Sequence, residues 1–248
     1  MCIRDSFTAC IVFPVSILLD GSLTKIERDR IFVIYIIAFF VIFFWAAYEQ
    51  AGASLTLFAA EQTDRTILGW EMPASWIQSF NPFFVVILAA IMPSVWGALN
   101  KRGMEPASPT KQAIGLLLLS LGYLVICFGV KDVQPGVKVS LIWLTGLYFI
   151  HTMGEIALSP IGLSMVNKLT PVRFASLMMG IWYLSTSTAN KFAGTLGGLY
   201  PEDGKVKTLL GFRIETMFDF FMVFVIMSGV ASLILFLLSK KLQKMMHG

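Results

Sequence analysis

The chain contains six long apolar segments, each close to or above the length that crosses a lipid bilayer. A spanning α-helix needs about 20 largely apolar residues. The segments cover residues 31–60, 77–99, 112–130, 139–166, 174–199 and 214–238. Stretches rich in Pro, Gly and charged residues separate them, as is typical of loops. The sequence therefore predicts an all-α membrane protein with six transmembrane helices.

The composition agrees with a chain that needs membrane lipid as a partner. Hydrophobic residues make up 56% of the chain and charged residues only 14%, whereas a soluble domain carries roughly a quarter charged residues. The net charge of +4 is modest, and no basic stripe interleaved with aromatics indicates a nucleic-acid partner. The three cysteines are widely spaced, so we expect neither a disulfide framework nor a metal site. No cofactor is indicated.

Lys and Arg are distributed unequally between alternate loops. One side carries Lys25, Arg28, Arg30, Lys101, Arg102, Lys111, Lys168, Arg173, Lys240, Lys241 and Lys244. The other side carries the smaller set Arg65, Lys131, Lys138, Lys205, Lys207 and Arg213. Cytoplasmic loops carry the excess of positive charge. We therefore expect a multi-pass protein of the inner (cytoplasmic) membrane, with both ends of the helical segment on the cytoplasmic side.

The first 24 residues fit this pattern poorly. The apolar stretch 7–19 is too short to span a bilayer and contains Pro14. It lacks the basic n-region and the cleavage site of a signal peptide. We interpret residues 1–24 as the remnant of a helix between two halves of a longer protein, or as a non-native start, with an interfacial helix as the alternative. Residues 25–248 then form a six-helix transmembrane bundle.

Four ionisable side chains inside the predicted helices stand out: Glu49, His151, Glu155 and Lys191. Charges within a membrane are costly and therefore mark functional sites. Glu49 and Glu155 lie far from the helix ends, so each needs a cation, a water-filled cavity or a bound proton. An ion pair that only locks two helices is the alternative. His151 either relays protons or packs in the core, and Lys191 can extend toward the membrane surface.

One face of the fourth predicted helix is polar. His151, Glu155 and Ser159 recur every four residues and so share a helical face. Pro160 follows directly, and a proline inside a helix leaves a carbonyl without its partner, as in the interrupted helices of transporters. This face is expected to line a cavity rather than to contact lipid.

Asn81 and two tryptophans are further candidates for a polar cavity. Asn81 precedes Pro82 and offers both a hydrogen-bond donor and an acceptor to a ligand. Alternatively, Asn81 caps the second predicted helix, with Pro82 in its first turn. Trp45 and Trp182 can form cavity walls, whereas anchoring at the membrane interface is the more frequent role of tryptophan.

Four sequence motifs resemble those of one transporter family. Residues 44–50 (FWAAYEQ) and 76–82 (WIQSFNP) resemble the seventh and eighth helices of the proton-dependent oligopeptide transporter family. Residues 154–164 (GEIALSPIGLS) and 179–184 (MGIWYL) resemble its tenth and eleventh helices. The motifs occur in the family's order and spacing over most of the chain.

The resemblance implies a fold and a function. The family belongs to the major facilitator superfamily, whose members have twelve core helices in two six-helix halves. This chain would be the C-terminal half of such a protein. The implied activity is proton-driven symport of di- and tripeptides, with protons as the coupling ion. Residues 1–24 would end one of the extra helices that some members carry between the halves.

The resemblance also implies roles for individual residues. Glu155 matches the glutamate that receives the peptide's ammonium group, and Asn81 matches the asparagine that binds the peptide backbone. Glu49 matches an acidic gating and proton-coupling position that pairs with a lysine of the other half. Trp45 and Trp182 match aromatic positions of the peptide pocket, and Ser159 lies one turn from Glu155.

The chain departs from the family where the N-terminal half would be. The acidic and arginine motif of the family's first helix, and the lysine of its fourth helix, are not in this sequence. Alternating access needs one half to move against the other. We therefore expect a fragment that does not transport without its missing N-terminal six-helix half.

The residues leave two other interpretations open and exclude a third. A half-size transporter or channel for another small solute, working as a homodimer, would place two copies of Glu49 and Glu155 around one pore. A purely structural membrane subunit would leave both glutamates without a role. An intramembrane protease is excluded, because Ser164 and His151 lie about 20 Å apart along one helix. We expect no enzymatic activity.

Overall fold

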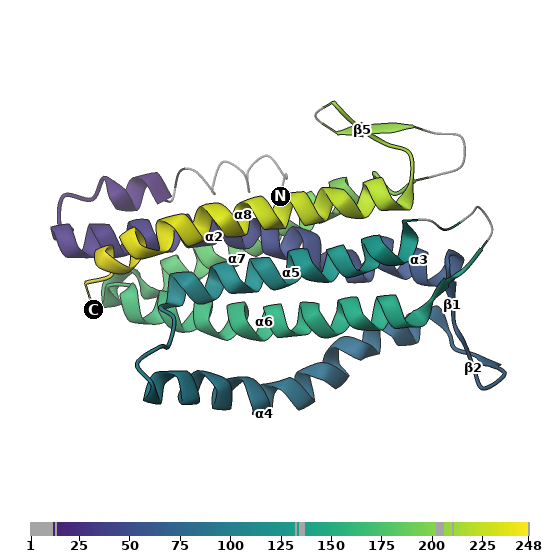
Figure 1. The fold of residues 1–248 in the computed structure, drawn as a ribbon. Helices are drawn as coiled ribbons and strands as arrows, with labels where there is room; N and C mark the ends of the chain where they lie inside the picture. Colours follow the sequence, from purple (N-terminus) through teal and green to yellow (C-terminus); the bar gives the residue numbers. More distant parts are fainter. Residues whose placement is uncertain are drawn as a thin grey trace.

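Long helices run side by side in an elongated bundle in the computed structural model of the chain (Figure 1). The structure describes residues 12, 14–131, 133, 137–201, 206–209 and 211–247. Its principal helices are α2 (Lys25–Tyr48), α3 (Ser54–Glu61), α4 (Phe80–Lys101), α5 (Ser108–Val130), α6 (Leu141–Leu169), α7 (Ala175–Gly197) and α8 (Met217–Met245). Each of the six predicted segments overlaps one of these helices or, for residues 31–60, two of them.

Five helical segments of the described chain are long and apolar enough to cross a membrane. They are Lys25–Glu61, Ala74–Lys101, Ser108–Val130, Leu141–Leu169 and Met217–Met245. The sixth expected span, α7, forms a helix and packs against α2, but it is not among these five. Its second half contains the polar run 185–188 (STST), Asn190 and Lys191, which lowers its mean hydropathy. The expected count of six spans is therefore confirmed for five.

The first spanning segment is interrupted. Thr24 caps α2, because its hydroxyl accepts a hydrogen bond from the Glu27 amide while the Glu27 carboxylate accepts one from the Thr24 amide. The helix continues to Tyr48, where a short 3₁₀ turn, η1 (Glu49–Gly52), replaces it. Ala53 then adopts a non-helical conformation before α3 begins. The sequence predicted one continuous helix here.

The buried Gln50 side chain fills this interruption. Its amide donates to the carbonyl oxygens of Ala46, at 3.2 Å, and Ala193, at 2.9 Å. Its oxygen accepts a hydrogen bond from the Ser54 hydroxyl at 2.7 Å. A buried break in a membrane helix persists only when such partners replace the lost backbone bonds. Gln50 thereby also joins the break to α7.

Short strands connect the helices at the end of the bundle opposite the C-terminus (Figure 1). β1 (Thr63–Asp64) pairs in parallel with β4 (Val139–Ser140), and β2 (Thr66–Ile67) pairs with β3 (Trp70–Glu71). Between α7 and α8, β5 (Lys207–Leu209) and β6 (Phe212–Ile214) form an antiparallel hairpin. Two 3₁₀ turns, η2 (Ala74–Ser79) and η3 (Val172–Phe174), lead into α4 and α7. The sequence predicted β1, β2, β3 and β5 as parts of loops, whereas β4 and the last residues of η2, η3 and β6 fall inside the segments that were predicted as helices.

The other end of the bundle joins the beginning of α2 to the end of α8. The Arg30 guanidinium donates to the carbonyl oxygens of Met246 and His247, and the His247 ring lies 2.9 Å from the Asp29 carboxylate. Residues 14–18 are helical. The remainder of the apolar stretch 7–19, apart from Val12 and Leu19, lies outside the described residues, so the interpretation of residues 1–24 stays a prediction.

Two glycines bring α5 and α6 into backbone contact. A Cβ atom added at Gly154 would lie 2.9 Å from the carbonyl oxygen of Gly115, and one added at Gly115 would lie 2.9 Å from the Leu158 Cβ. Larger residues at either position would push the helices apart. Small residues are the usual means of close helix packing in membranes, where lipid removes most of the hydrophobic driving force.

Replacing Gly154 by leucine should therefore destabilise the bundle. Overpacking of a filled interior costs about 1 to 3 kcal/mol, so the thermal midpoint of the purified protein in detergent should fall by several degrees. Gly180→Leu is the matched control, because a Cβ at Gly180 meets no atom within 4 Å. Equal midpoints for the two variants would contradict the close packing of α5 on α6.

Candidate functional site

The Glu155 carboxylate is the centre of a polar cluster inside the bundle. Glu155 lies midway along α6 and is half-buried. Its Oε2 atom accepts a hydrogen bond of 2.5 Å from the Tyr48 hydroxyl, at the end of α2. The same atom accepts one of 2.9 Å from the Asn81 side-chain amide, in the first turn of α4. Three helices that are distant in sequence thus meet at one carboxylate oxygen.

Asn81 connects this carboxylate to two hydroxyl groups. Its Nδ2 atom contacts the Tyr48 hydroxyl and lies 3.1 Å from the Thr152 hydroxyl. Thr152 in turn donates to the carbonyl oxygen of Tyr148 at 2.7 Å. We call Tyr48, Asn81, Thr152 and Glu155 the Glu155 cluster. Since the Asn81 side chain binds other helices, the alternative that it caps its own helix is not what the structure shows.

Glu49 lies beside the cluster and is exposed. It opens η1 directly after Tyr48, and its carboxylate is within electrostatic range of Glu155. Within the described part of the chain Glu49 forms no salt bridge. Two neighbouring carboxylates disfavour each other's charged form. The interruption after α2 therefore places a second acidic group next to Glu155, and no described residue forms a salt bridge with it.

The two tryptophans lie in different places. Trp45 is half-buried, and its ring meets that of Tyr48 edge-to-face at 5.4 Å. Trp45 therefore borders the Glu155 cluster. Trp182 is buried in α7 and packs on α6 at Gly162, where an added Cβ would lie 2.6 Å from its ring. Seven residues separate Gly162 from Glu155, a rise of about 10 Å along the helix.

Ser159 lies between these two places. It is half-buried, one turn beyond Glu155 on the same helical face. The predicted site residues thus form a row along α6 rather than one cluster. Trp45, Asn81 and Glu49 lie at or beside Glu155, Ser159 lies one turn further, and Trp182 packs two turns further.

His151 belongs to the packed core behind the cluster. It is 2% exposed, and its Nε2 atom lies 3.1 Å from the Leu119 carbonyl oxygen. Its ring lies 4.7 Å from that of Tyr123 and covers Gly122 of α5. Of the two interpretations made from the sequence, core packing fits these contacts better than a proton relay.

Tyr48 and Thr152 were not predicted as site residues from the sequence. Tyr48 stood inside a motif that was noted for its neighbours Trp45 and Glu49. Its spacing of three from Trp45, which places both on one helical face, was the available signal. Thr152 lies three residues before Glu155 on the polar face of α6, and the same periodicity could have identified it.

Two tyrosine variants distinguish the stability contributed by the Tyr48 hydrogen bond from that contributed by burying a tyrosine ring. Tyr48→Phe removes a donor to a carboxylate, an interaction of about 1.5 to 3 kcal/mol, and should lower the thermal midpoint by several degrees. Tyr148→Phe is the control, because its buried hydroxyl has no hydrogen-bond partner among the described residues. We expect that variant to unfold at the same temperature or higher. A larger loss for Tyr148→Phe than for Tyr48→Phe would contradict the cluster.

Within the described residues, no group of three or more His, Cys, Asp or Glu side chains could hold a metal ion. Cys127 is a free, buried thiol in α5. The chemistry offered by the cluster is therefore that of hydroxyl, amide and carboxyl groups: hydrogen bonding, binding of a cation, and uptake or release of a proton.

The family profile described as the POT family matches residues 10–212 of this chain. The peptide transporter YePEPT of Yersinia enterocolitica is 37% identical over 185 residues, which are 74% of this chain and 36% of that protein. Dipeptide and tripeptide permease A of Escherichia coli is 30% identical over 218 residues, which are 88% of this chain and 43% of the permease.

Solved structures of the same family share the fold. A crystal structure of a POT peptide transporter with sulfate superposes with a TM-score of 0.86 at 28% identity, covering 99% of this chain and 47% of the other. A POT family transporter in complex with 5-aminolevulinic acid gives a TM-score of 0.82 at 26% identity, covering 96% of this chain and 46% of the other.

These similarities agree with the resemblance of the four sequence motifs to the transporter family. They also show how much of a family member this chain covers. The chain spans less than half the length of the relatives and structures named above. Its helices have the arrangement of part of a major facilitator superfamily transporter, and POT members are transporters and not enzymes. This chain is a multi-pass membrane protein and belongs to the POT family.

Proposed function

We propose that this chain is the C-terminal six-helix half of a proton-coupled symporter of di- and tripeptides, with α7 as its sixth spanning helix. The observation that carries the proposal is the Glu155 cluster, a carboxylate held between three helices beside a helix break. Interrupted helices at mid-membrane are where transporters of this superfamily bind substrate. The peptide transport named for the relatives supports the substrate class.

The cluster has acceptors suited to the amino end of a peptide. The Tyr48 and Asn81 donors both contact Oε2 of Glu155, and Oε1 has no hydrogen-bond partner within the described residues. An ammonium group offers three donors and no acceptor, so it complements this second oxygen. The Asn81 nitrogen is held by Glu155, Tyr48 and Thr152, and its oxygen can accept a hydrogen bond from a peptide N–H. Trp45 borders the site with an aromatic face, and Ser159 and Trp182 extend it along α6.

The same carboxylate can couple peptide binding to proton movement. A carboxylate that binds an ammonium ion must be charged, whereas one that has taken up a proton is neutral. Glu155 therefore binds either the peptide ammonium or a proton, and Glu49 next to it raises the cost of holding two negative charges. We propose that Glu49 pairs with a cation of the N-terminal half when that half closes over the site.

We propose that the working transporter contains a second, N-terminal half and lies in the inner membrane, with both ends of residues 25–248 on the cytoplasmic side. The coverage of 36% to 44% of the curated relatives supports the first point. The excess of Lys and Arg at the end shared by Lys25 and Lys244 supports the second. A peptide carboxylate would then be bound by cations of the N-terminal half.

An immunoblot of native membranes with an antibody to residues 240–248 tests this proposal. We expect a band near twice the 27.5 kDa of this chain, and proton-driven dipeptide uptake by the longer protein. A band at 27.5 kDa, together with a homodimer on cross-linking, would instead favour the half-size transporter or channel. Uptake that is independent of the proton gradient would refute the coupling.

A further inference from the structure

The side chain of Gln112, in the second turn of α5, lies against the part of α6 that contains Pro160. It is fully buried. Its Nε2 atom donates to the Leu158 carbonyl oxygen at 2.9 Å, two residues before the proline. Two residues after the proline, a Cβ atom added at Gly162 would lie 3.1 Å from the same nitrogen. The Gln112 amide therefore bridges the two sides of the proline.

Pro160 weakens α6 at this point. A proline has no backbone N–H, so the Ile156 carbonyl oxygen does not receive the hydrogen bond that the residue four positions later normally donates. Prolines are the usual points at which helices bend. Glu155 directly precedes the weakened turn. A change of bend there moves its carboxylate relative to Tyr48 and Asn81, because these partners belong to other helices.

The two parts of α6 differ in what holds them. Before the proline, Gly154 and Gly115 bring the backbones of α6 and α5 into contact. After the proline, the Trp182 ring of α7 packs on Gly162. The first contact is between two backbones and leaves little freedom, whereas the second depends on the position of α7.

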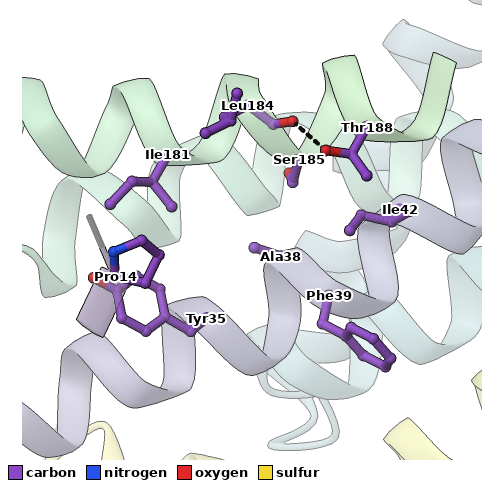
Figure 2. Close-up of a pocket in the computed structure, with 9 residues that line it drawn as sticks. All are labelled: Pro14, Tyr35, Ala38, Phe39, Ile42, Ile181, Leu184, Ser185 and Thr188. Atoms are coloured by element: carbon purple, nitrogen blue, oxygen red, sulfur yellow. Dashed lines mark hydrogen bonds between the residues drawn. The ribbon is translucent and has the colours of Figure 1, made fainter. Parts of the chain in front are cut away.

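The packing leaves α7 room to move. Figure 2 shows a hollow between α2 and α7, with Tyr35 and Ala38 on one helix and Ile181 and Ser185 on the other. Its volume is about 260 Å³. Trp182 therefore does not by itself hold the end of α6 rigidly. A directional hydrogen bond from α5, across the proline, restricts the angle between the two parts of α6.

The hydrogen bonding of Gln112 is incomplete. Its Oε1 atom is buried and has no hydrogen-bond partner among the described residues. A buried acceptor without a donor costs about as much free energy as one hydrogen bond contributes, or more. The bond to Leu158 and the unpartnered oxygen therefore offset each other. The amide adds little to the stability of the folded chain, which allows a role in positioning to be distinguished from a role in stability.

We propose that Gln112 is a positioning residue for Glu155. Its amide holds the turn around Pro160 in one conformation and so keeps the Glu155 carboxylate in place within the Glu155 cluster. Gln112 acts through α6, since its amide binds the Leu158 carbonyl and not the carboxylate. This role rests on the proposed function of Glu155 as the group that receives the peptide ammonium.

Gln112→Met in the complete transporter tests this role, because methionine keeps the unbranched shape of the side chain and removes both polar atoms of the amide. We expect the KM of dipeptide uptake to rise roughly tenfold with little change in the maximal rate, since a misplacement of about 1 Å costs up to about a hundredfold. The thermal midpoint should stay the same or rise.

Ser232→Ala is the matched control. The Ser232 hydroxyl also donates to a buried helix, at 2.8 Å from the carbonyl oxygen of Ala113, the residue that follows Gln112. This bond joins α8 to α5 and does not involve α6. Its loss should lower the thermal midpoint and leave KM unchanged. Equal KM values for the two variants would overturn the proposal. A midpoint for Gln112→Met as low as that of Ser232→Ala would overturn it as well, because the amide would then stabilise the fold.

A distance measurement on α6 tests the same role without transport. Spin labels at Ile142→Cys and Lys168→Cys, exposed positions near the two ends of α6, lie about 39 Å apart along a straight helix. Gln112→Met should broaden the distance distribution, and Ser232→Ala should leave it as in the wild type. Equal distributions in all three proteins would overturn the role of Gln112. Absence of dipeptide uptake by the wild type would instead refute the proposed function, and the distances would still decide whether Gln112 fixes α6.

Discussion

Glu155→Gln in the complete transporter should abolish proton-driven dipeptide uptake. The substitution keeps the size of the side chain and its contacts with Tyr48 and Asn81, but it removes the charge that receives the ammonium group. Loss of one partner of a buried charge pair costs about 2 to 5 kcal/mol. Since about 1.4 kcal/mol corresponds to a tenfold change, uptake at low substrate concentration should fall by about thirtyfold or more.

The control for this experiment is another glutamine substitution at a glutamate of the same chain. Glu215→Gln changes an exposed carboxylate that pairs with Arg213 beyond the helices, and it should leave uptake unchanged. Both variants should reach the membrane in equal amounts on an immunoblot. Normal uptake by Glu155→Gln would refute the role proposed for this residue, and would leave the cluster as a structural contact between helices.

Glu49→Gln should separate proton coupling from peptide binding. Glu49 is exposed and lies near Glu155, yet makes no hydrogen bond to the cluster within the described residues. Its removal should leave peptide binding intact while the influence of one carboxylate on the other disappears. We expect accumulation against a gradient to fall by roughly tenfold, the factor that corresponds to one unit of proton affinity, while exchange of labelled for unlabelled peptide continues.

The two assays on one preparation of vesicles make this prediction specific. Accumulation is measured with an imposed proton gradient, and exchange is measured without a gradient in vesicles preloaded with peptide. Loss of both activities would mean that Glu49 binds the peptide itself. Retention of both would mean that proton coupling resides in Glu155 and in the N-terminal half.

Most helices could be predicted from the sequence because the apolar composition that marks them is local and strong. The apolar segments 77–99, 112–130, 139–166 and 214–238 overlap α4, α5, α6 and α8, since hydrocarbon around a helix demands apolar side chains along its whole length. The interruption after Tyr48 was not predicted. The run from residue 31 to 60 has the length and the mainly apolar composition of one helix, and the break depends on the Gln50 amide reaching the Ala193 carbonyl of another helix.

Part of the candidate site followed from the same reasoning. A carboxylate in an apolar helix is conspicuous, so Glu155 and Glu49 were predicted from the cost of burying their charge. Asn81 was found as an amide next to a proline. Tyr48 was overlooked because a tyrosine is ordinary in a membrane helix. Its hydroxyl gains significance only through its 2.5 Å hydrogen bond to a residue 107 positions further along the chain.

The sequence by itself determined that this chain lies in a membrane, where its helices run, and which two carboxylates are out of place among apolar residues. Those properties depend on each segment's own composition. The tertiary structure decided that Tyr48, Asn81 and Thr152 meet at Glu155 and that Trp182 packs two turns away from them. Such contacts join residues far apart in the chain, and only the packing of one helix on another brings them within hydrogen-bond distance.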